Sequence, residues 1–242
     1  MKLLITGAAG RIGSRFVKQH SQDYEFVLTD IRPPQDEAGH EWHIGNLADA
    51  EFVASLTDGI DAVIHLAADA RMSAPWVDLI GPNILGSLNV FEAACDAGVK
   101  RLVFASTVNT VTGYPPDQPV HVDWPTRPVT RYGATKCFGE SLCHLYSSKG
   151  MSCIALRLGW VIDASRVMSD LDDEQHNIFV SYHDVLQVTE LALHAPLDYG
   201  FRLYNVLGDN SVKRLDIQAT IDELGYQPTS GVDMQRNIPE AG

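Results

Sequence analysis

Short apolar runs alternate with helical stretches from the first residues of the chain onward. These runs are typical of buried strands and cover Lys2–Thr6, Glu25–Thr29, Ala62–Leu66, Arg101–Ser106 and Cys153–Leu158. Strands separated by helices pair in parallel, because each crossover helix carries the chain back to the same end of the sheet. The alternation therefore predicts an α/β fold with a doubly wound parallel sheet.

The length of 242 residues suits one sizeable domain. Helices are predicted at about residues 83–98 and 132–149, and the regular alternation ends at Leu158. Beyond it the sequence predicts an irregular stretch at 163–177, a helix at 184–194, a strand at 203–206 and a helix at 214–224. We expect one compact unit, in which residues 1–158 bind a nucleotide cofactor and residues 159–242 form a small substrate-binding portion.

Composition disfavours several kinds of partner and site. The 31 acidic and 18 basic residues give a net charge of -13, which disfavours nucleic acid and anionic membranes. No apolar run approaches the roughly 18 residues of a membrane-spanning helix, and the N-terminus runs directly into a strand, so a cytoplasmic protein is expected. The four cysteines show no C-x-x-C spacing, and His40-Glu41-x-His43 reads as a surface or strand-entry segment, so no metal site is expected.

A glycine-rich segment follows the first predicted strand and opens a helix. It reads Thr6-Gly7-Ala8-Ala9-Gly10-Arg11-Ile12-Gly13. This is the context of a dinucleotide fingerprint, because glycines admit a pyrophosphate and the helix N-terminus offers unpaired N–H groups. Asp30 ends the next strand 20 residues after Gly10, where a carboxylate bonds the adenosine ribose and repels a 2'-phosphate. NAD is therefore favoured over NADP, although Arg32 could receive the additional phosphate.

Tyr132 and Lys136 lie four residues apart in a predicted helix and therefore share one face. A nearby ammonium favours the phenolate form of a tyrosine, so this pair can serve as a proton acceptor. Thr107 ends an apolar strand 25 residues upstream of Tyr132. An ordinary pair of helix side chains without a catalytic role is the alternative interpretation. The glycine-rich loop, and its order in the chain relative to this pair, favour a catalytic role.

Taken in order, these segments resemble the extended short-chain dehydrogenase/reductase family, also called the NAD-dependent epimerase/dehydratase family. The matching segments are residues 6–13, N-L-A-D at 46–49, H-L-A-A at 65–68, N-I-L-G-S-L-N at 83–89, F-A-S-T at 104–107 and Y-G-A-T-K at 132–136. The resemblance implies a Rossmann-type fold with NAD as the cofactor. The cofactor-binding residues that it implies are Gly7, Gly10, Arg11, Ile12, Gly13, Asp30, Ile31, Arg32, Asn46, Leu47, Leu66, Ala67, Ala68, Asn83, Tyr132 and Lys136.

The resemblance also implies the catalytic roles. Tyr132 would exchange a proton with the substrate, Lys136 would bond the nicotinamide ribose and lower the tyrosine pKa, and Thr107 would hold the substrate oxygen during hydride transfer. Within the family, the run from Tyr132 to Glu140 is similar to that of uronate dehydrogenases. The substrate-binding residues implied are Ser106, Asn109, Trp160 and Arg166, with the Arg166 guanidinium clamping a carboxylate.

We therefore expect an NAD-dependent oxidoreductase that oxidises a sugar or sugar-acid hydroxyl. Two alternatives stay open: a sugar epimerase or dehydratase that keeps NAD tightly bound, and a sensor that binds NAD(H) without turnover. The two predicted helices at 83–98 and 132–149 also carry more apolar residues than one core face needs, namely Leu88, Phe91, Leu142, Leu145 and Tyr146. A homodimer through a four-helix contact, common in this family, is therefore expected.

Overall fold

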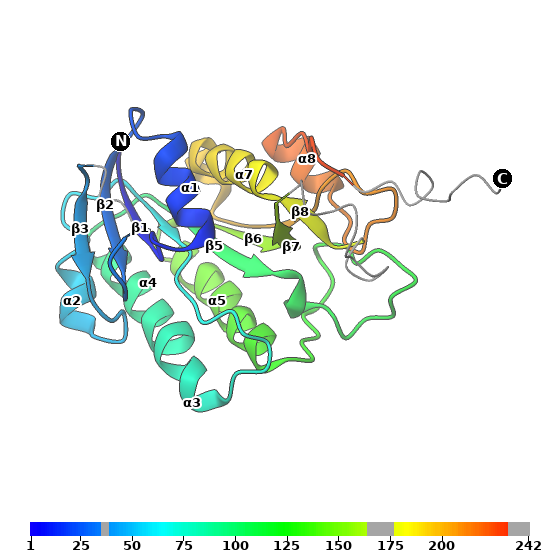
Figure 1. The fold of residues 1–242 in the computed structure, drawn as a ribbon, viewed down its shortest axis with the longest axis horizontal. Helices are drawn as coiled ribbons and strands as arrows, with labels where there is room; N and C mark the ends of the chain where they lie inside the picture. Colours follow the sequence, from blue (N-terminus) through cyan, green and yellow to red (C-terminus); the bar gives the residue numbers. More distant parts are fainter. Residues whose placement is uncertain (35–38, 164–176, 232–242) are drawn as a thin grey trace.

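A parallel sheet of seven strands forms the centre of the molecule (Figure 1). The computed structural model describes residues 1–34, 39–163 and 177–231. The strands lie in the order β3-β2-β1-β4-β5-β6-β9. Their bounds are β1 Lys2–Thr6, β2 Glu25–Asp30, β3 Glu41–Ile44, β4 Ala62–His65, β5 Arg101–Thr107, β6 Ser152–Leu158 and β9 Phe201–Val206. The predicted doubly wound parallel sheet is confirmed.

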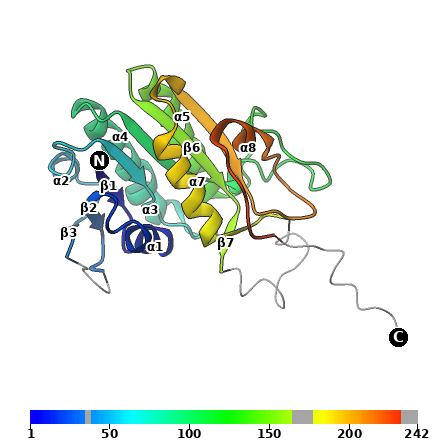
Figure 2. The same cartoon turned by 90° about the horizontal axis from the view of Figure 1, so that it is seen from above.

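Helices cover both faces of the sheet (Figure 2). On one face lie α1 (Arg11–Gln19) and α7 (Tyr182–His194), and on the other lie α2 (Ala50–Ala54), α4 (Gly86–Asp96) and α5 (Arg131–Ser147). Alternate side chains of each strand point to opposite layers, so Leu3 and Ile5 enter the core beside α1 and α7, and Leu4 enters the other. Burial on both faces explains why the strands read as continuous apolar runs in the sequence.

The order of strands reverses between β1 and β4. The chain passes outward from β1 to β2 and β3, and then returns to build β4, β5 and β6 on the other side of β1. In open parallel sheets a crevice forms at the carboxyl ends of the strands where the order reverses. The glycine-rich loop after β1 and the segment after β4 lie at this crevice, which positions the candidate site.

The segment that leads into α4 differs from the prediction. A short helix α3 (Trp76–Leu79) and a π-helix η1 (Ile80–Leu85) precede α4, where the sequence predicts a regular helix from Asn83. Pro82 within this segment has no N–H group, so a regular i to i−4 hydrogen bond is missing there, and the winding is wider. The π-helix places Asn83 against α5.

The last predicted helix is shorter than expected. It begins at Gln218 and not at Arg214, as α8 (Gln218–Leu224). The backbone of the preceding residues pairs with Val120 instead: the Val120 N–H donates to the Arg214 carbonyl at 2.9 Å, and the Asp216 N–H donates to the Val120 carbonyl at 3.0 Å. These bonds join the last third of the chain to the loop before α5.

Strand β3 at the sheet edge is a further element that the sequence pattern does not predict. Its four residues are only partly buried or exposed and form no apolar run. The His43 ring pairs with the Glu41 carboxylate at 2.8 Å. His40 therefore directly precedes this edge strand, and His43 lies within it.

The last third of the chain adds strand β9 to the sheet beside β6. It also contributes a small sheet of β7 (Trp160–Ile162) and β8 (Phe179–Ser181). Two short 3-10 helices complete the described elements: η2 (Val108–Thr110) directly after β5, and η4 (Leu197–Tyr199) before β9. The division at residue 158 into a cofactor-binding and a substrate-binding portion stays a prediction. Within the described residues, no helix has the length and apolar character needed to cross a membrane.

Candidate active site

The loop between β1 and α1 forms a cradle with room for a pyrophosphate. Gly7 has a φ of 70°, and a Cβ built there would lie 2.7 Å from the backbone nitrogen of Ala67. A Cβ at Gly13 would lie 2.7 Å from the Cα of Ala8. Helix α1 begins without a side-chain cap, so its first N–H groups are available to phosphate oxygens. The loop therefore fits the dinucleotide that the sequence predicts.

Asp30 lies at the adenosine end of this groove. Its Oδ2 accepts the Ala9 N–H at 3.0 Å, and its Oδ1 accepts the Arg32 N–H at 3.2 Å. These bonds hold the carboxylate at a cavity of about 340 Å³, where it can accept hydrogen bonds from ribose hydroxyls. The predicted cofactor residues that line this cavity are Gly7, Gly10, Asp30, Ile31, Arg32, Asn46, Leu47, Leu66, Ala67 and Ala68.

A smaller cavity of about 210 Å³ contains the predicted catalytic residues. Thr107 comes from the end of β5, and Tyr132 and Lys136 come from the first turns of α5. Leu66 and Ala68 line this cavity as well as the adenosine cavity, so the two adjoin. A dinucleotide that begins at Asp30 can therefore extend to the predicted catalytic residues.

The start of α5 is fixed by local hydrogen bonding. The Thr130 hydroxyl accepts the Gly133 N–H at 2.9 Å, which is the usual capping bond of a helix N-terminus. A Cβ at Gly133 would lie 2.3 Å from the Asn109 carbonyl oxygen, so the first turn packs directly on η2. This close approach places Tyr132 beside Thr107.

Asn109 donates two hydrogen bonds to the Thr107 hydroxyl. The Thr107 Oγ1 accepts the Asn109 N–H at 3.3 Å and the Asn109 side-chain amide at 3.1 Å. With both acceptor sites occupied, the hydroxyl hydrogen is available to the Tyr132 oxygen, and Thr107 lowers the pKa of Tyr132. Asn109, a predicted substrate residue, thus lies next to the catalytic pair and orients Thr107.

Lys136 is buried between α5 and β5. Its ammonium donates to the Ala105 carbonyl at 2.8 Å and lies 4.7 Å from the centre of the Phe104 ring. Burial lowers the pKa of Lys136 to about 7. The lysine is therefore held in a position from which it can reach a ribose hydroxyl of the bound cofactor.

The pKa of Tyr132 differs from the sequence prediction. Burial raises the pKa of Tyr132 to about 12, and the hydrogen bond with Thr107 opposes this increase. The Lys136 nitrogen lies 5.9 Å from the centre of the tyrosine ring and is aimed at Ala105, so the lysine does not bring the phenol pKa below its usual value. NAD held in this groove would supply the hydride acceptor, and the positive charge of its nicotinamide would favour the phenolate form of Tyr132.

The remaining predicted substrate residues occupy different surroundings. Ser106 lines the catalytic cavity, but its hydroxyl donates to Glu140 at 2.6 Å. Trp160 is 38% exposed at the start of β7, and its neighbours Gly159 and Val161 line the cavity in its place. Arg166 lies outside the described residues, so its role as a carboxylate clamp stays a prediction.

Asn83 acts as a buried clamp beside the groove. Its side chain accepts the Asp69 N–H at 2.8 Å and donates to the Asp69 carbonyl at 3.0 Å. It also donates to the Thr135 hydroxyl at 2.9 Å. Asn83 therefore ties the segment after β4 to α5, and Asp69 itself lines the adenosine cavity.

Tyr182 is a cavity residue that the sequence analysis did not single out for the site. It begins α7 and lines the catalytic cavity, and the Arg15 guanidinium lies 4.0 Å from the centre of its ring. The signal available in the sequence was its place at the start of a helix in the last third of the chain. Only the packing of α7 against α1 brings it to the catalytic residues.

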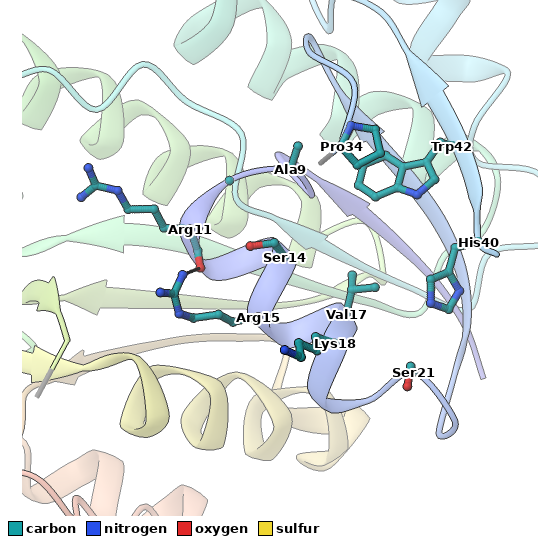
Figure 3. Close-up of a pocket in the computed structure, with 11 residues that line it drawn as sticks. Ala9, Arg11, Ser14, Arg15, Val17, Lys18, Ser21, Pro34, His40 and Trp42 are labelled. Atoms are coloured by element: carbon teal, nitrogen blue, oxygen red, sulfur yellow. Dashed lines mark hydrogen bonds between the residues drawn. The ribbon is translucent and has the colours of Figure 1, made fainter. Parts of the chain in front are cut away.

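A larger cavity of about 610 Å³ lies between α1 and the segment that leads into β3 (Figure 3). Pro34 and Trp42 lie at one end, and the guanidinium groups of Arg11 and Arg15 point away from them. Arg15 donates to the Arg11 carbonyl at 2.9 Å. The charges do not converge on one point, and the catalytic residues lie elsewhere, so we assign the site to the two smaller cavities.

Comparisons with known proteins identify the family of the chain. The model of the NAD dependent epimerase/dehydratase family matches residues 3–179. The chain belongs to this family. Uronate dehydrogenase of Pseudomonas putida is 33% identical over 99% of this chain and 88% of its own length. L-arabinose 1-dehydrogenase (NAD(P)(+)) of Haloferax volcanii is 31% identical over 94% of this chain and 96% of its own.

A solved structure extends the likeness to this family. The crystal structure of uronate dehydrogenase from Agrobacterium tumefaciens, a tyrosine-to-alanine mutant complexed with NAD, has a TM-score of 0.85 and 29% identity. The match covers 97% of this chain and 86% of that one. The predicted epimerase/dehydratase family, its Rossmann-type fold and NAD as cofactor are thus confirmed. Across 1–34, 39–163 and 177–231, no cluster of three His, Cys, Asp or Glu side chains could hold a metal ion.

Replacing Asp30 with alanine tests the adenosine end of the groove. Asp30→Ala removes the acceptor for the ribose hydroxyls and the charge that repels a 2'-phosphate. We expect NADH to bind at least about tenfold more weakly, while NADPH binding is unchanged or stronger. Fluorescence titration with both dinucleotides measures the two effects. Asp61→Ala is the matched control, because Asp61 bonds the Lys2 N–H at 2.7 Å outside the groove. Equal losses for NADH and NADPH would show that Asp30 does not select between them.

Proposed function

We propose that this protein oxidises a hydroxyl group of a sugar or sugar acid, with NAD as the hydride acceptor. The supporting observation is that Thr107, Tyr132 and Lys136 line one cavity, which adjoins the dinucleotide groove. Thr107 and Tyr132 hold the substrate hydroxyl, and Tyr132 takes its proton as the carbon gives up hydride to the nicotinamide. Lys136 holds the nicotinamide ribose and thereby the geometry of the transfer.

The size of the catalytic cavity favours a small substrate. Beyond the predicted cofactor and catalytic residues, its wall consists of Ala70, Gly159, Val161 and Tyr182 among others, within a volume of about 210 Å³. Relatives that match at least 93% of this chain are named as dehydrogenases of uronates, of L-arabinose and of glucose 6-phosphate, all of monosaccharide size. We infer a monosaccharide or its acid as substrate, with a uronate as the preferred choice and Arg166 as the residue for its carboxylate.

Replacing Tyr132 with phenylalanine tests this function. Wild-type protein is expected to produce NADH with at least one member of a panel of uronates, aldoses and polyols. Tyr132→Phe keeps the ring and removes the proton acceptor, so we expect kcat to fall by at least about 100-fold. NADH absorbance measures both results. Tyr204→Phe is the matched control, because the Tyr204 hydroxyl bonds Glu223 at 2.8 Å on strand β9 and not in the cavity.

The same assay separates the alternatives. Purified protein that carries stoichiometric NAD and interconverts sugars without net NADH would be an epimerase or dehydratase. Protein that binds NADH but turns over no substrate, and that is unaffected by Tyr132→Phe, would be a sensor. Activity on aldoses without activity on any uronate would contradict the carboxylate clamp at Arg166.

We also propose that the reaction takes place in the cytoplasm. All four cysteines, Cys95, Cys137, Cys143 and Cys153, are free thiols. Free thiols suit a reducing compartment, and a soluble dinucleotide is the second substrate of the proposed reaction.

A homodimer through α4 and α5 is a further part of the proposal. Phe91, Leu142 and Tyr146 turn out to be buried in the core of this chain, so they are not surplus apolar surface. Leu85, which directly precedes α4, and Leu145, on α5, remain 44% and 47% exposed. Apolar side chains exposed on neighbouring helices support a contact with a second copy.

Light scattering at micromolar protein tests the dimer. The wild type is expected to show twice the mass of one chain, and Leu145→Glu is expected to show the mass of a monomer, because a charge would be buried in the contact. Val212→Glu is the control, since Val212 is 52% exposed in the last third of the chain. A monomeric wild type would refute the proposal.

A further inference from the structure

A buried ion pair lies one helical turn beyond Lys136. The side chains of Glu140 on α5 and Arg157 on β6 are 7% and 2% exposed. Arg157 donates from Nε to Oε1 and from Nη2 to Oε2 of Glu140, both at 2.9 Å. The Ser106 hydroxyl donates to the same Oε1 at 2.6 Å. Both carboxylate oxygens therefore accept from a charged donor in a bidentate arrangement, and one accepts a hydroxyl as well.

This trio of Ser106, Glu140 and Arg157 connects the segments that carry the catalytic residues. Ser106 directly precedes Thr107 on β5, and Glu140 follows Lys136 by four residues on α5. Arg157 lies opposite Ser106 in the register of β5 and β6. Its Nη1 also donates to the Val122 carbonyl at 3.3 Å, in the loop that leads to α5. A shift of any of the three side chains would therefore move the ends of β5 and β6 and the middle of α5 relative to one another.

Helix α5 and strand β5 approach each other closely at the same level. A Cβ at Gly139 would lie 2.1 Å from the tip of the Phe104 ring, so only glycine allows this approach. Two polar bonds hold α5 to β5 next to the contact. One is the Lys136 bond to the Ala105 carbonyl at 2.8 Å, and the other is the Ser106 bond to Glu140. The second bond fixes the residue next to Thr107.

A contribution to the stability of the fold does not by itself explain why these three polar side chains are buried together. Burying two charges costs desolvation free energy, and well-packed apolar side chains in place of a buried ion pair often give equal or greater stability. We propose that Ser106, Glu140 and Arg157 are positioning residues, which hold the Thr107 hydroxyl at the hydrogen-bonding position for Tyr132. This inference rests on the proposed oxidation and assigns Ser106 to the support of Thr107 and not to the binding of substrate.

Ser106→Ala is the first test, because it leaves the ion pair intact and removes one bond. Because the Thr107 hydroxyl is then held less firmly, we expect kcat to fall about tenfold, while KM for the sugar and the affinity for NADH change less than about twofold. A direct contact of Ser106 with substrate would instead raise KM. Thr220→Ala is the matched control: the Thr220 hydroxyl is buried and donates to the Asn205 carbonyl at 2.6 Å in the last third of the chain. It should lower the melting temperature to a similar extent and leave kcat unchanged.

Glu140→Gln is the second test. It keeps the shape of the side chain and an acceptor for Ser106, and it leaves Arg157 without its countercharge, so kcat is expected to fall at least as far as in Ser106→Ala. Where this variant does not fold, Ser106→Ala decides. The inference is overturned if the kcat of Ser106→Ala equals that of the wild type or falls no further than the kcat of Thr220→Ala. It is also overturned if Ser106→Ala raises KM and leaves kcat unchanged. A wild type without turnover on any sugar would instead refute the proposed function, which separates the two failures.

Discussion

The contact between helix α5 and strand β5 is the constraint on which the candidate site depends. It buries the Lys136 ammonium, whose donor bond to the Ala105 carbonyl spans the two elements. Burying an ammonium is unfavourable unless it is hydrogen-bonded, so the carbonyl and the face of the Phe104 ring are needed around it. Gly139 makes the approach possible, because any side chain there would collide with that ring. The same contact sets Tyr132 against Thr107.

The cofactor groove depends on a second close approach, at the point where the strand order reverses. Gly7 and Gly13 leave the space that a pyrophosphate needs, and the carboxylate of Asp30 is held by backbone N–H groups at the far end. The sheet joins the two regions, because β1 and β4 carry the groove and the adjacent β5 carries Thr107. The groove and the cavity lined by Thr107 therefore adjoin on one rigid sheet.

Much of this arrangement can be read from the sequence because it rests on local signals. Strands buried on both faces give continuous apolar runs, and the glycine-rich loop follows directly from the space it must leave. The four-residue spacing of Tyr132 and Lys136 fixes their common face once the helix is recognised. The direction of the Tyr132 pKa could not be predicted, since it depends on how deeply tertiary packing buries the phenol.

Features that depend on pairing between distant segments were missed for the same reason. The edge strand β3 has no apolar run, and the start of α8 is set by the backbone bonds of Val120 with a segment about a hundred residues away. The Asn83 clamp and the Glu140–Arg157 pair join residues of different elements, which no local pattern indicates. His65 is a further case: it bonds Thr6 and Ser87, and burial lowers its pKa to about 3.

The most direct test of the account concerns the burial of Lys136. Its pKa is lowered from 10.5 to about 7 in the folded chain. Between these values Lys136 binds a proton in the unfolded chain and not in the folded chain. The free energy of unfolding therefore rises with pH in this window. Below the window Lys136 is charged in both states, and the full cost of burying the ammonium reduces the free energy of unfolding. Denaturant unfolding of the wild type and of Lys136→Met at a series of pH values measures this contribution. The account predicts that the wild type gains stability relative to the variant as the pH rises from about 7 to 10.5. Parallel stability curves for the two proteins would contradict it.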